Sequence, residues 1–186
     1  MNTLLEKFTS GDLRSDGLAS EVAASVVDDL SLLPLLTSGL DENDPVVRAR
    51  SADALEKVTR MQPEVLKDRL PQMVRLALTD EVPMVRWHMA MIFANLDLED
   101  AATRWVIDTL IQMLGDISVF VRSWVISSLC ILGRRVEDKR MEILDNIKYM
   151  EDDDSPAVRS RVQNALACLE DVGRPLPTGW SKNDAV

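Results

Sequence analysis

Apolar residues recur with helical periodicity after four arginines that are spread along the chain. Each arginine follows a valine, and large apolar residues come seven and ten positions after it. The four pairs are Val47-Arg48, Val85-Arg86, Val121-Arg122 and Val158-Arg159, so the arginines are 38, 36 and 37 residues apart. Offsets of −1, +3, +7 and +10 lie on one face of an α-helix. The pattern predicts four amphipathic helices, each opened by a Val-Arg pair.

A second amphipathic stretch precedes each Val-Arg helix, and a short acidic turn separates the two. These stretches are 32–40, 70–78, 106–114 and 143–150, and in two of them an internal Leu-Pro step predicts a kink. The predicted unit is helix, acidic turn, helix, repeated at approximately 27–60, 61–98, 99–134 and 135–171. Residues 1–26 predict N-terminal capping helices, and residues 172–186 predict an irregular tail with Trp180 as a candidate anchor.

The repeat resembles the HEAT repeat of α-solenoids. The segment 80–86 (DEVPMVR), followed by Ala90 and Phe93, carries the motif, and repeat one matches it with Asp44, Arg48, Ala52 and Leu55. The resemblance covers residues 27–171 and implies an all-α fold: a right-handed α-α superhelix of about four HEAT-like hairpins with an N-terminal cap. It also implies a structural ladder of repeat arginines and turn aspartates: Arg48, Arg86, Arg122, Arg159, Asp44, Asp80 and Asp116.

In the HEAT geometry the second helix of each repeat lines the concave surface. In repeats two and three the face opposite the predicted core is apolar and aromatic where the binary pattern requires polar residues. The predicted partner-binding residues are Trp87, His88, Met91, Asn95, Trp124, Ser127 and Ile131, and the predicted polar rim is Arg50, Asp53, Arg161 and Asn164. Exposed tryptophans would form a binding hot spot, whereas tryptophans wedged between neighbouring helices would be structural.

The net charge of the chain limits the classes of partner that it can bind. The 186 residues include 21 Lys+Arg and 31 Asp+Glu, a net charge of −10, which disfavours nucleic acid and anionic membranes. The acidic turns either cap helices and keep the chain soluble, or steer a basic partner. We therefore expect a protein or peptide partner, a basic one if the turns steer it. The oligomeric state stays open.

Location and cofactors follow from what the chain lacks. No charge-free stretch reaches the roughly 18–20 residues of a membrane helix, and residues 1–9 do not resemble a secretory signal. Cys130 and Cys168 lie in apolar helical patterns without metal spacing, which favours a reduced cytoplasmic compartment. Neither a metal nor a cofactor is expected.

Catalysis has little support in the residues. His88 is the only histidine, and the chain has neither a phosphate-binding glycine loop nor a nucleophile elbow. The preferred hypothesis is a non-enzymatic scaffold or adaptor that binds a peptide or helix in its concave groove.

Two alternatives come from the HEAT resemblance. HEAT-like alkylpurine DNA glycosylases use Trp and Asp in a basic groove, where Trp87, Trp124 and Asp53 would serve, but the acidic charge argues against this reading. Proteins resembling phycobilin lyases handle a tetrapyrrole, which a groove with Trp, His and Cys could hold. Their repeats are typically shorter than the spacing in this chain.

Overall fold

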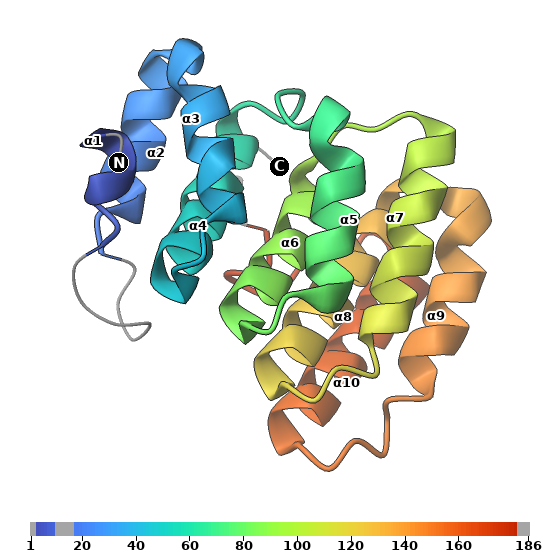
Figure 1. Cartoon of the computed structure of the whole chain (residues 1–186). Coiled ribbons are helices and arrows are strands. Elements are labelled where there is room, and N and C mark those ends of the chain that lie inside the picture. Colours follow the sequence, from blue (N-terminus) through green and yellow to red (C-terminus); the bar gives the residue numbers. More distant parts are fainter. Residues whose placement is uncertain (1–2, 10–16, 182–186) are drawn as a thin grey trace. The chain divides into compact units, whose positions relative to one another are not determined.

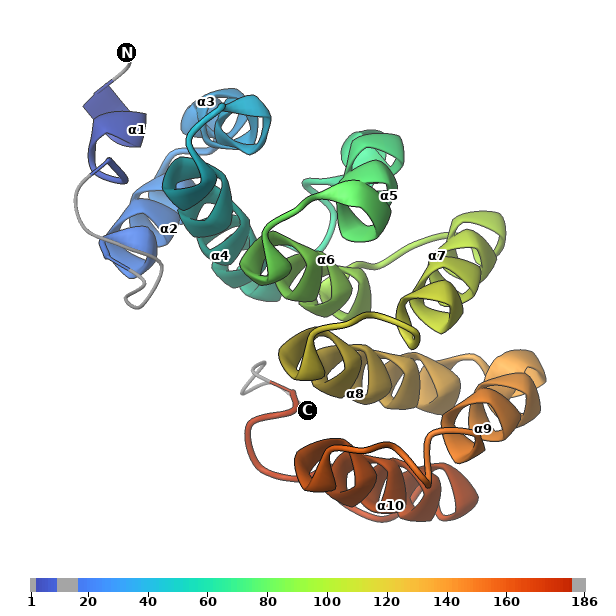
Figure 2. The same cartoon turned by 60° about the horizontal axis from the view of Figure 1, so that its bottom comes forward.

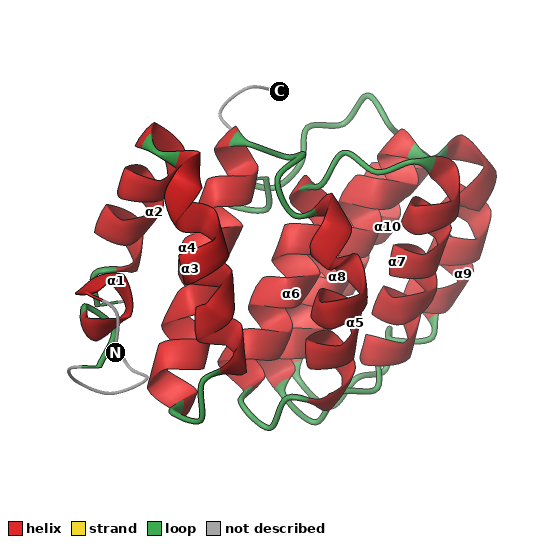
Figure 3. Ribbon diagram, turned by 45° about the horizontal axis from the view of Figure 1, so that its top comes forward, coloured by secondary structure: helices red, strands yellow, loops and turns green. Residues whose placement is uncertain are grey.

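The computed structural model describes residues 3–9 and 17–181, and these residues form helices, turns and loops without a strand (Figures 1 and 3). Parts of the predicted cap (1–2 and 10–16) and of the predicted tail (182–186) lie outside the described residues. The chain divides into two compact units, Met1–Asp97 and Leu98–Val186.

Unit 1 contains two layers of helices. α2 (Ala19–Asp28), α4 (Pro45–Met61) and α6 (Pro83–Asn95) pack side by side, and α3 (Leu33–Ser38) and α5 (Leu70–Thr79) pack on α4 and α6 respectively (Figure 2). The short α1 (Thr3–Glu6) packs on α3. Single 3₁₀ turns precede and follow α3 and precede α5: η1 (Leu30–Leu32), η2 (Gly39–Asp41) and η3 (Lys67–Arg69).

Unit 2 repeats this arrangement with two hairpins. α8 (Val119–Arg135) and α10 (Pro156–Glu170) pack together, while α7 (Asp100–Met113) packs on α8 and α9 (Arg140–Lys148) packs on both (Figure 2). The 3₁₀ turn η4 (Glu137–Lys139) leads into α9. Beyond α10 the described chain has no regular structure up to Ser181.

The core follows the offsets counted from the repeat arginines. At −1, +7 and +10 every side chain is buried except Leu166, which is half-buried; the buried ones are Val47, Leu55, Val58, Val85, Phe93, Leu96, Val121, Leu129, Leu132, Val158 and Leu169. Full burial of one such side chain contributes about 1.5–3 kcal/mol of transfer free energy. This apolar face holds the hairpins together.

The prolines of the two Leu-Pro steps stand at the beginning of helices and do not kink them. Pro34 and Pro71 stand in the first turn of α3 and α5, so the predicted kinks are absent. Proline is tolerated there because the first-turn N–H groups have no partner within the helix. The stretch predicted at 32–40 is divided among η1, α3 and η2, and α7 begins six residues before the predicted Val106.

Among the described residues, no single helix is long and apolar enough to cross a membrane; α2 and residues Leu30–Asp41 satisfy that criterion only as a pair bent by 120°.

Candidate functional site

A repeated turn places an aspartate six residues before the repeat arginine. Asp80, Asp116 and Asp153 each accept a hydrogen bond from the backbone N–H two residues later, at 2.8, 2.7 and 2.8 Å from carboxylate oxygen to nitrogen. The carbonyl of the same aspartate accepts from the arginine of its own repeat at 2.7, 2.7 and 2.6 Å. In each turn one aspartate therefore accepts hydrogen bonds through both its side-chain carboxylate and its backbone carbonyl.

Two of these aspartates also bind the arginine of the preceding repeat within their unit. Arg48 Nε lies 3.0 Å from Asp80 Oδ2 in unit 1. In unit 2 Arg122 donates twice to Asp153, from Nε to Oδ2 at 2.7 Å and from Nη2 to Oδ1 at 3.0 Å. A two-pronged guanidinium–carboxylate contact fixes both distance and orientation.

The first turn differs from the predicted ladder. Asp44 stands four residues before Arg48, and its carboxylate caps α4 by accepting from Val46 N–H at 2.8 Å. The position six residues before Arg48 belongs to Glu42, whose carbonyl accepts from Arg48 Nη1 at 3.0 Å. Asp44 is thus a helix cap and does not bind a repeat arginine, and Asp153, which the predicted ladder omits, does.

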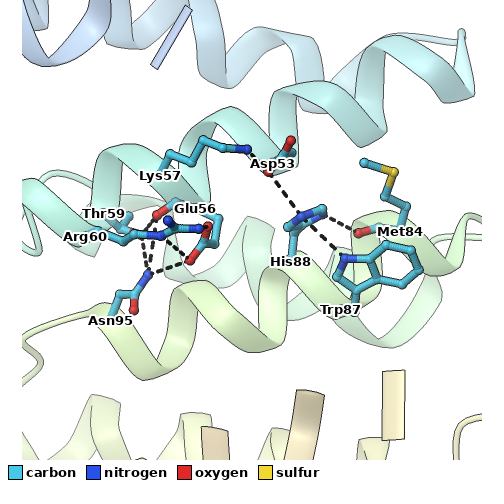
Figure 4. Close-up of polar contacts among 9 residues, drawn as sticks. All are labelled: Asp53, Glu56, Lys57, Thr59, Arg60, Met84, Trp87, His88 and Asn95. Atoms are coloured by element: carbon cyan, nitrogen blue, oxygen red, sulfur yellow. Dashed lines mark hydrogen bonds and ion pairs between the residues drawn. The ribbon is translucent and has the colours of Figure 1, made fainter. Parts of the chain in front are cut away.

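Unit 1 contains a polar cluster between α4 and α6 (Figure 4), called here the Asp53 cluster and made of Asp53, Lys57, Trp87 and His88. Asp53 is 5% exposed and His88 is 6% exposed. Asp53 forms an ion pair with Lys57 one turn further along α4. His88 Nε2 lies 3.3 Å from Asp53 Oδ1, so the cluster joins the two helices.

His88 has three polar neighbours for two ring nitrogens. Nδ1 lies 2.8 Å from the Met84 carbonyl, which only accepts, so Nδ1 carries a proton. Nε2 lies 3.3 Å from Trp87 Nε1, a donor, and also faces Asp53, an acceptor. The ring of His88 therefore connects Trp87 and the Asp53 carboxylate to the Met84 carbonyl.

Burial is the largest influence on Asp53 and raises its pKa. The hydrogen bonds and positive charges of His88 and Lys57 together outweigh burial and lower the pKa of Asp53 to about 2. Asp53 is consequently an ionised, nearly buried carboxylate at neutral pH.

A second carboxylate lies one turn from Asp53 on α4. Glu56 is 1% exposed and pairs with Arg60, whose Nε donates to Oε1 at 2.8 Å. Asn95 of α6 donates to Glu56 Oε1 at 3.3 Å and to Thr59 Oγ1 at 3.2 Å (Figure 4). The surface of α4 next to α6 thus carries two buried carboxylates below the partly exposed cationic groups of Lys57 and Arg60.

Unit 2 contains a cation between two indole rings. The guanidinium carbon of Arg161 lies 4.6 Å from the centre of the Trp124 ring and 5.5 Å from that of Trp180. Arg161 Nη1 also donates to the Ser123 carbonyl and to Ser127 Oγ. Burial lowers the pKa of Arg161. This group is called here the Arg161 sandwich.

No protein-family model matches the chain, and no curated protein sequence matches it. Among solved structures the chain is similar to the complex of CpcE and CpcF of phycocyanin lyase from Nostoc sp. PCC7120, with a TM-score of 0.72 and 24% identity over 88% of this chain and 95% of that chain. It is also similar to an engineered protein, with a TM-score of 0.61 and 19% identity over 90% of this chain and 79% of that chain. At these identities the likeness concerns the fold. The chain is an all-α helical-repeat protein, so the predicted fold class is confirmed.

The same comparison corrects the prediction that the chain is not an enzyme. A chain with this fold along 95% of its length belongs to a lyase complex, which contradicts that prediction. The repeat spacing was also a poor reason to set the lyase alternative aside, because the fold likeness extends over 88% of this chain.

The face predicted to be open is largely closed. Asp53, His88, Met91 and Ser127 are buried, and the other predicted partner-binding and rim residues apart from Arg50 are half-buried: Trp87, Asn95, Trp124, Ile131, Arg161 and Asn164. In unit 1 the reason is that α4 has neighbours on three sides, α2, α3 and α6, so a helix in the stack shows little free surface. Trp87 belongs to unit 1 and Trp124 to unit 2, and the predicted common groove stays a prediction.

Arg50 departs furthest from its predicted place in a polar rim. It is 1% exposed, and its Nη1 donates to the carbonyl of Phe8 at 2.7 Å. Gly17, at a φ of +56°, lies against the same side chain. Arg50 therefore fastens the N-terminal segment to α4.

Sequence reasoning also missed Glu56 and Lys57 as members of a site. Their acid–base spacing of four residues, Asp53 to Lys57 and Glu56 to Arg60, is a helix signal that was available in the sequence. Trp180 was expected as an anchor, but its contact with Arg161 has no sequence signal because it joins the tail to α10.

Proposed function

We propose that the chain is a HEAT-like subunit of a lyase assembly, which binds an open-chain tetrapyrrole and works together with a second helical-repeat protein. The observation that carries the proposal is the fold likeness to the CpcE–CpcF complex of phycocyanin lyase, at a TM-score of 0.72 over 88% of this chain. That neighbour is a complex of two proteins, which supports a protein partner for this chain.

The Asp53 cluster offers the chemistry that an open-chain tetrapyrrole needs. Pyrrole N–H groups are donors, and an ionised carboxylate such as Asp53 is the strongest acceptor that a side chain provides. The conjugated rings require an apolar flat surface, which the half-buried Trp87 supplies. A pyrrole N–H would take the place of Lys57 at this nearly buried carboxylate, where little water competes for the hydrogen bond.

The cations beside the cluster suit the acidic side chains of a bilin. Lys57 and Arg60 have partly exposed side chains, 22% and 20%, whereas the carboxylates that they pair with are almost fully buried. A propionate of the ligand would approach these two cations from solvent while the pyrroles face Asp53.

The thiols of this chain are left out of the proposed role. Cys130 and Cys168 are both buried, and burial raises the pKa of Cys130 to about 12. A thiol is nucleophilic as the thiolate, so Cys130 is inert at neutral pH. We therefore propose that this chain holds the tetrapyrrole without a covalent bond to its own cysteines.

An absorption titration tests the proposal. Biliverdin is added to the wild-type chain and to Asp53→Asn, Lys57→Ala and, as the matched control, Asp145→Asn, an exposed aspartate on α9. We expect a saturable change in the visible band for the wild type and the control, with at least tenfold weaker binding by Asp53→Asn. An unchanged biliverdin spectrum with the folded wild type, or equal affinity for all four proteins, would rule the proposed role out.

A further inference from the structure

The irregular tail of unit 2 folds back over the helices that precede it. Three contacts hold it: Arg134 Nη2 of α8 donates to the Val172 carbonyl at 2.6 Å, Cys168 Sγ of α10 contacts the Pro175 carbonyl at 3.7 Å, and Arg161 lies against the Trp180 ring. Trp180 is 8% exposed. The tail thus ends in one buried aromatic anchor on the helical layer formed by α8 and α10.

The surface under Trp180 is built to receive an aromatic ring. Arg161 is half-buried and presents its charge to two indole faces. Within residues 3–9 and 17–181 no carboxylate pairs with it; its hydrogen bonds go to the neutral oxygens of Ser123 and Ser127. A cation that has lost water and has no counter-charge gains most from the negative face of an aromatic ring.

The apolar character of this surface continues along α8. Phe120, Trp124 and Ile131 stand at spacings of four and seven residues, which is one side of the helix. Phe120 is 65% exposed, although aromatic side chains of that size are usually covered. Arg161 lies over the Trp124 ring, so this apolar side of α8 extends from the exposed Phe120 to the Arg161 sandwich.

The tail segment itself shows which ligand fits. Residues 172–181 read VGRPLPTGWS: two prolines, then a turn in which Trp180 N–H bonds to the Pro177 carbonyl at 3.1 Å and Gly179 has a φ of +82°. Prolines keep the segment extended and lower the entropy that it loses on binding. The glycine turn then delivers the tryptophan to Arg161.

We propose that this face of unit 2 is a binding surface for a proline-containing segment that presents a tryptophan, and that the chain's own residues 172–181 occupy it as an internal ligand. A partner protein carrying such a segment displaces the tail. This surface lies in unit 2 and goes beyond the proposed tetrapyrrole function, which rests on residues of unit 1.

Tethering explains why an external segment competes poorly with the tail. A ligand joined by a short connection has an effective concentration in the millimolar range. An external peptide of the same sequence must overcome that advantage unless the internal anchor is removed. Loss of the indole at position 180 therefore opens the surface to the external peptide.

A peptide-binding experiment on the full chain tests this inference. The probe is a fluorescein-labelled peptide of residues 172–181, measured by fluorescence anisotropy against wild type, Trp180→Ala, the double variant Trp180→Ala/Arg161→Ala, and the control Trp105→Ala, which removes an exposed tryptophan of α7. We expect Trp180→Ala to bind the peptide at least tenfold more tightly than wild type or Trp105→Ala. The double variant should bind the peptide no more tightly than wild type does. A peptide with alanine in place of its tryptophan should bind Trp180→Ala no more tightly than it binds wild type.

A second measurement avoids variants that fail to fold. The wild-type chain is labelled with 5-fluorotryptophan, which gives one fluorine NMR signal for each of its four tryptophans. Excess unlabelled peptide should shift the Trp180 and Trp124 signals and leave the Trp105 signal in place. Equal peptide affinity of wild type and Trp180→Ala, or Trp180 and Trp124 signals that stay unmoved at millimolar peptide, overturns the inference.

Discussion

Arg122 holds Asp153 through two hydrogen bonds, at 2.7 and 3.0 Å, and so links the turn before α8 to the turn before α10. The same aspartate caps the start of α10 through Ser155 N–H and accepts from Arg159 through its carbonyl. One side chain thus ties together two hairpins and one helix terminus. The hydrogen bond from Arg122 lowers the pKa of Asp153 more than any other influence does.

The Arg122–Asp153 contact should contribute measurably to stability. We expect Asp153→Asn and Arg122→Lys each to lower the free energy of unfolding by about 1–3 kcal/mol, because both destroy the paired contact and lysine cannot restore it. Urea denaturation measures the effect. The control is Asp152→Asn, an exposed neighbour in the same turn, which should change stability by less than about 0.5 kcal/mol. Equal effects of the two asparagine variants would contradict this role.

Gly17 is required by two separate constraints. Its φ is +56°, and an added Cβ would lie 2.9 Å from the guanidinium carbon of Arg50. We expect Gly17→Ala to lower the melting temperature, since the alanine is strained and displaces a buried arginine. Gly179→Ala is the control, because its φ of +82° also strains an alanine but no atom lies within 4 Å of the added Cβ. If Gly17→Ala lowers the melting temperature less than Gly179→Ala does, the contact with Arg50 does not contribute to stability.

The thiol of Cys130 should resist alkylation. Burial raises its pKa to about 12, so almost no thiolate is present near neutral pH. We expect iodoacetamide at about pH 8 to leave Cys130 unmodified in the folded chain and to modify it fully in guanidinium chloride. Peptide mass spectrometry reads the modification at each cysteine. Rapid labelling of Cys130 in the folded chain would contradict the buried, neutral thiol and the proposal that it takes no covalent part.

Asp53 should make the free energy of unfolding depend on pH below about pH 4. Its pKa is about 2 in the folded chain, below the ordinary 3.8, so its contribution is present above about pH 4 and is lost as the pH falls toward 2. The contribution amounts to about 2 kcal/mol. The stability difference between wild type and Asp53→Asn should therefore shrink over that range, as measured by chemical denaturation at several pH values. If the stability difference between wild type and Asp53→Asn stays constant from neutral pH to pH 2, the prediction is wrong.

The hairpin core was predictable from the sequence because each repeat marks its own register. A valine-arginine pair fixes the phase of the helix, and the apolar residues counted from it are buried in both units. The spacing predicts helical hairpins, and the resemblance to the HEAT repeat implies the fold class. Prolines were harder to interpret, since a Leu-Pro step looks the same whether it begins a helix, as at Pro71, or bends one.

The site was less predictable because burial in a helical stack depends on neighbours that are remote in sequence. Helical phase placed Asp53 and Arg50 on an open face, but α2 and α6 cover both sides of α4. The pairing of His88 with Asp53 and that of Arg161 with Trp180 join residues 35 and 19 positions apart. Only the pairs within one helix, such as Asp53 with Lys57, have a spacing that the sequence reveals.

Circular dichroism in the visible region tests the proposed function most directly. Free biliverdin interconverts between mirror-image conformers, so its circular dichroism cancels in the visible region. A protein site that fixes one conformer induces a circular dichroism band there. The proposed function predicts an induced band for biliverdin mixed with the wild-type chain or with Asp145→Asn. With Asp53→Asn, at least tenfold more protein should be needed to reach half of the full band. No induced band with the folded wild-type chain, at concentrations where the titration should be saturated, would contradict it.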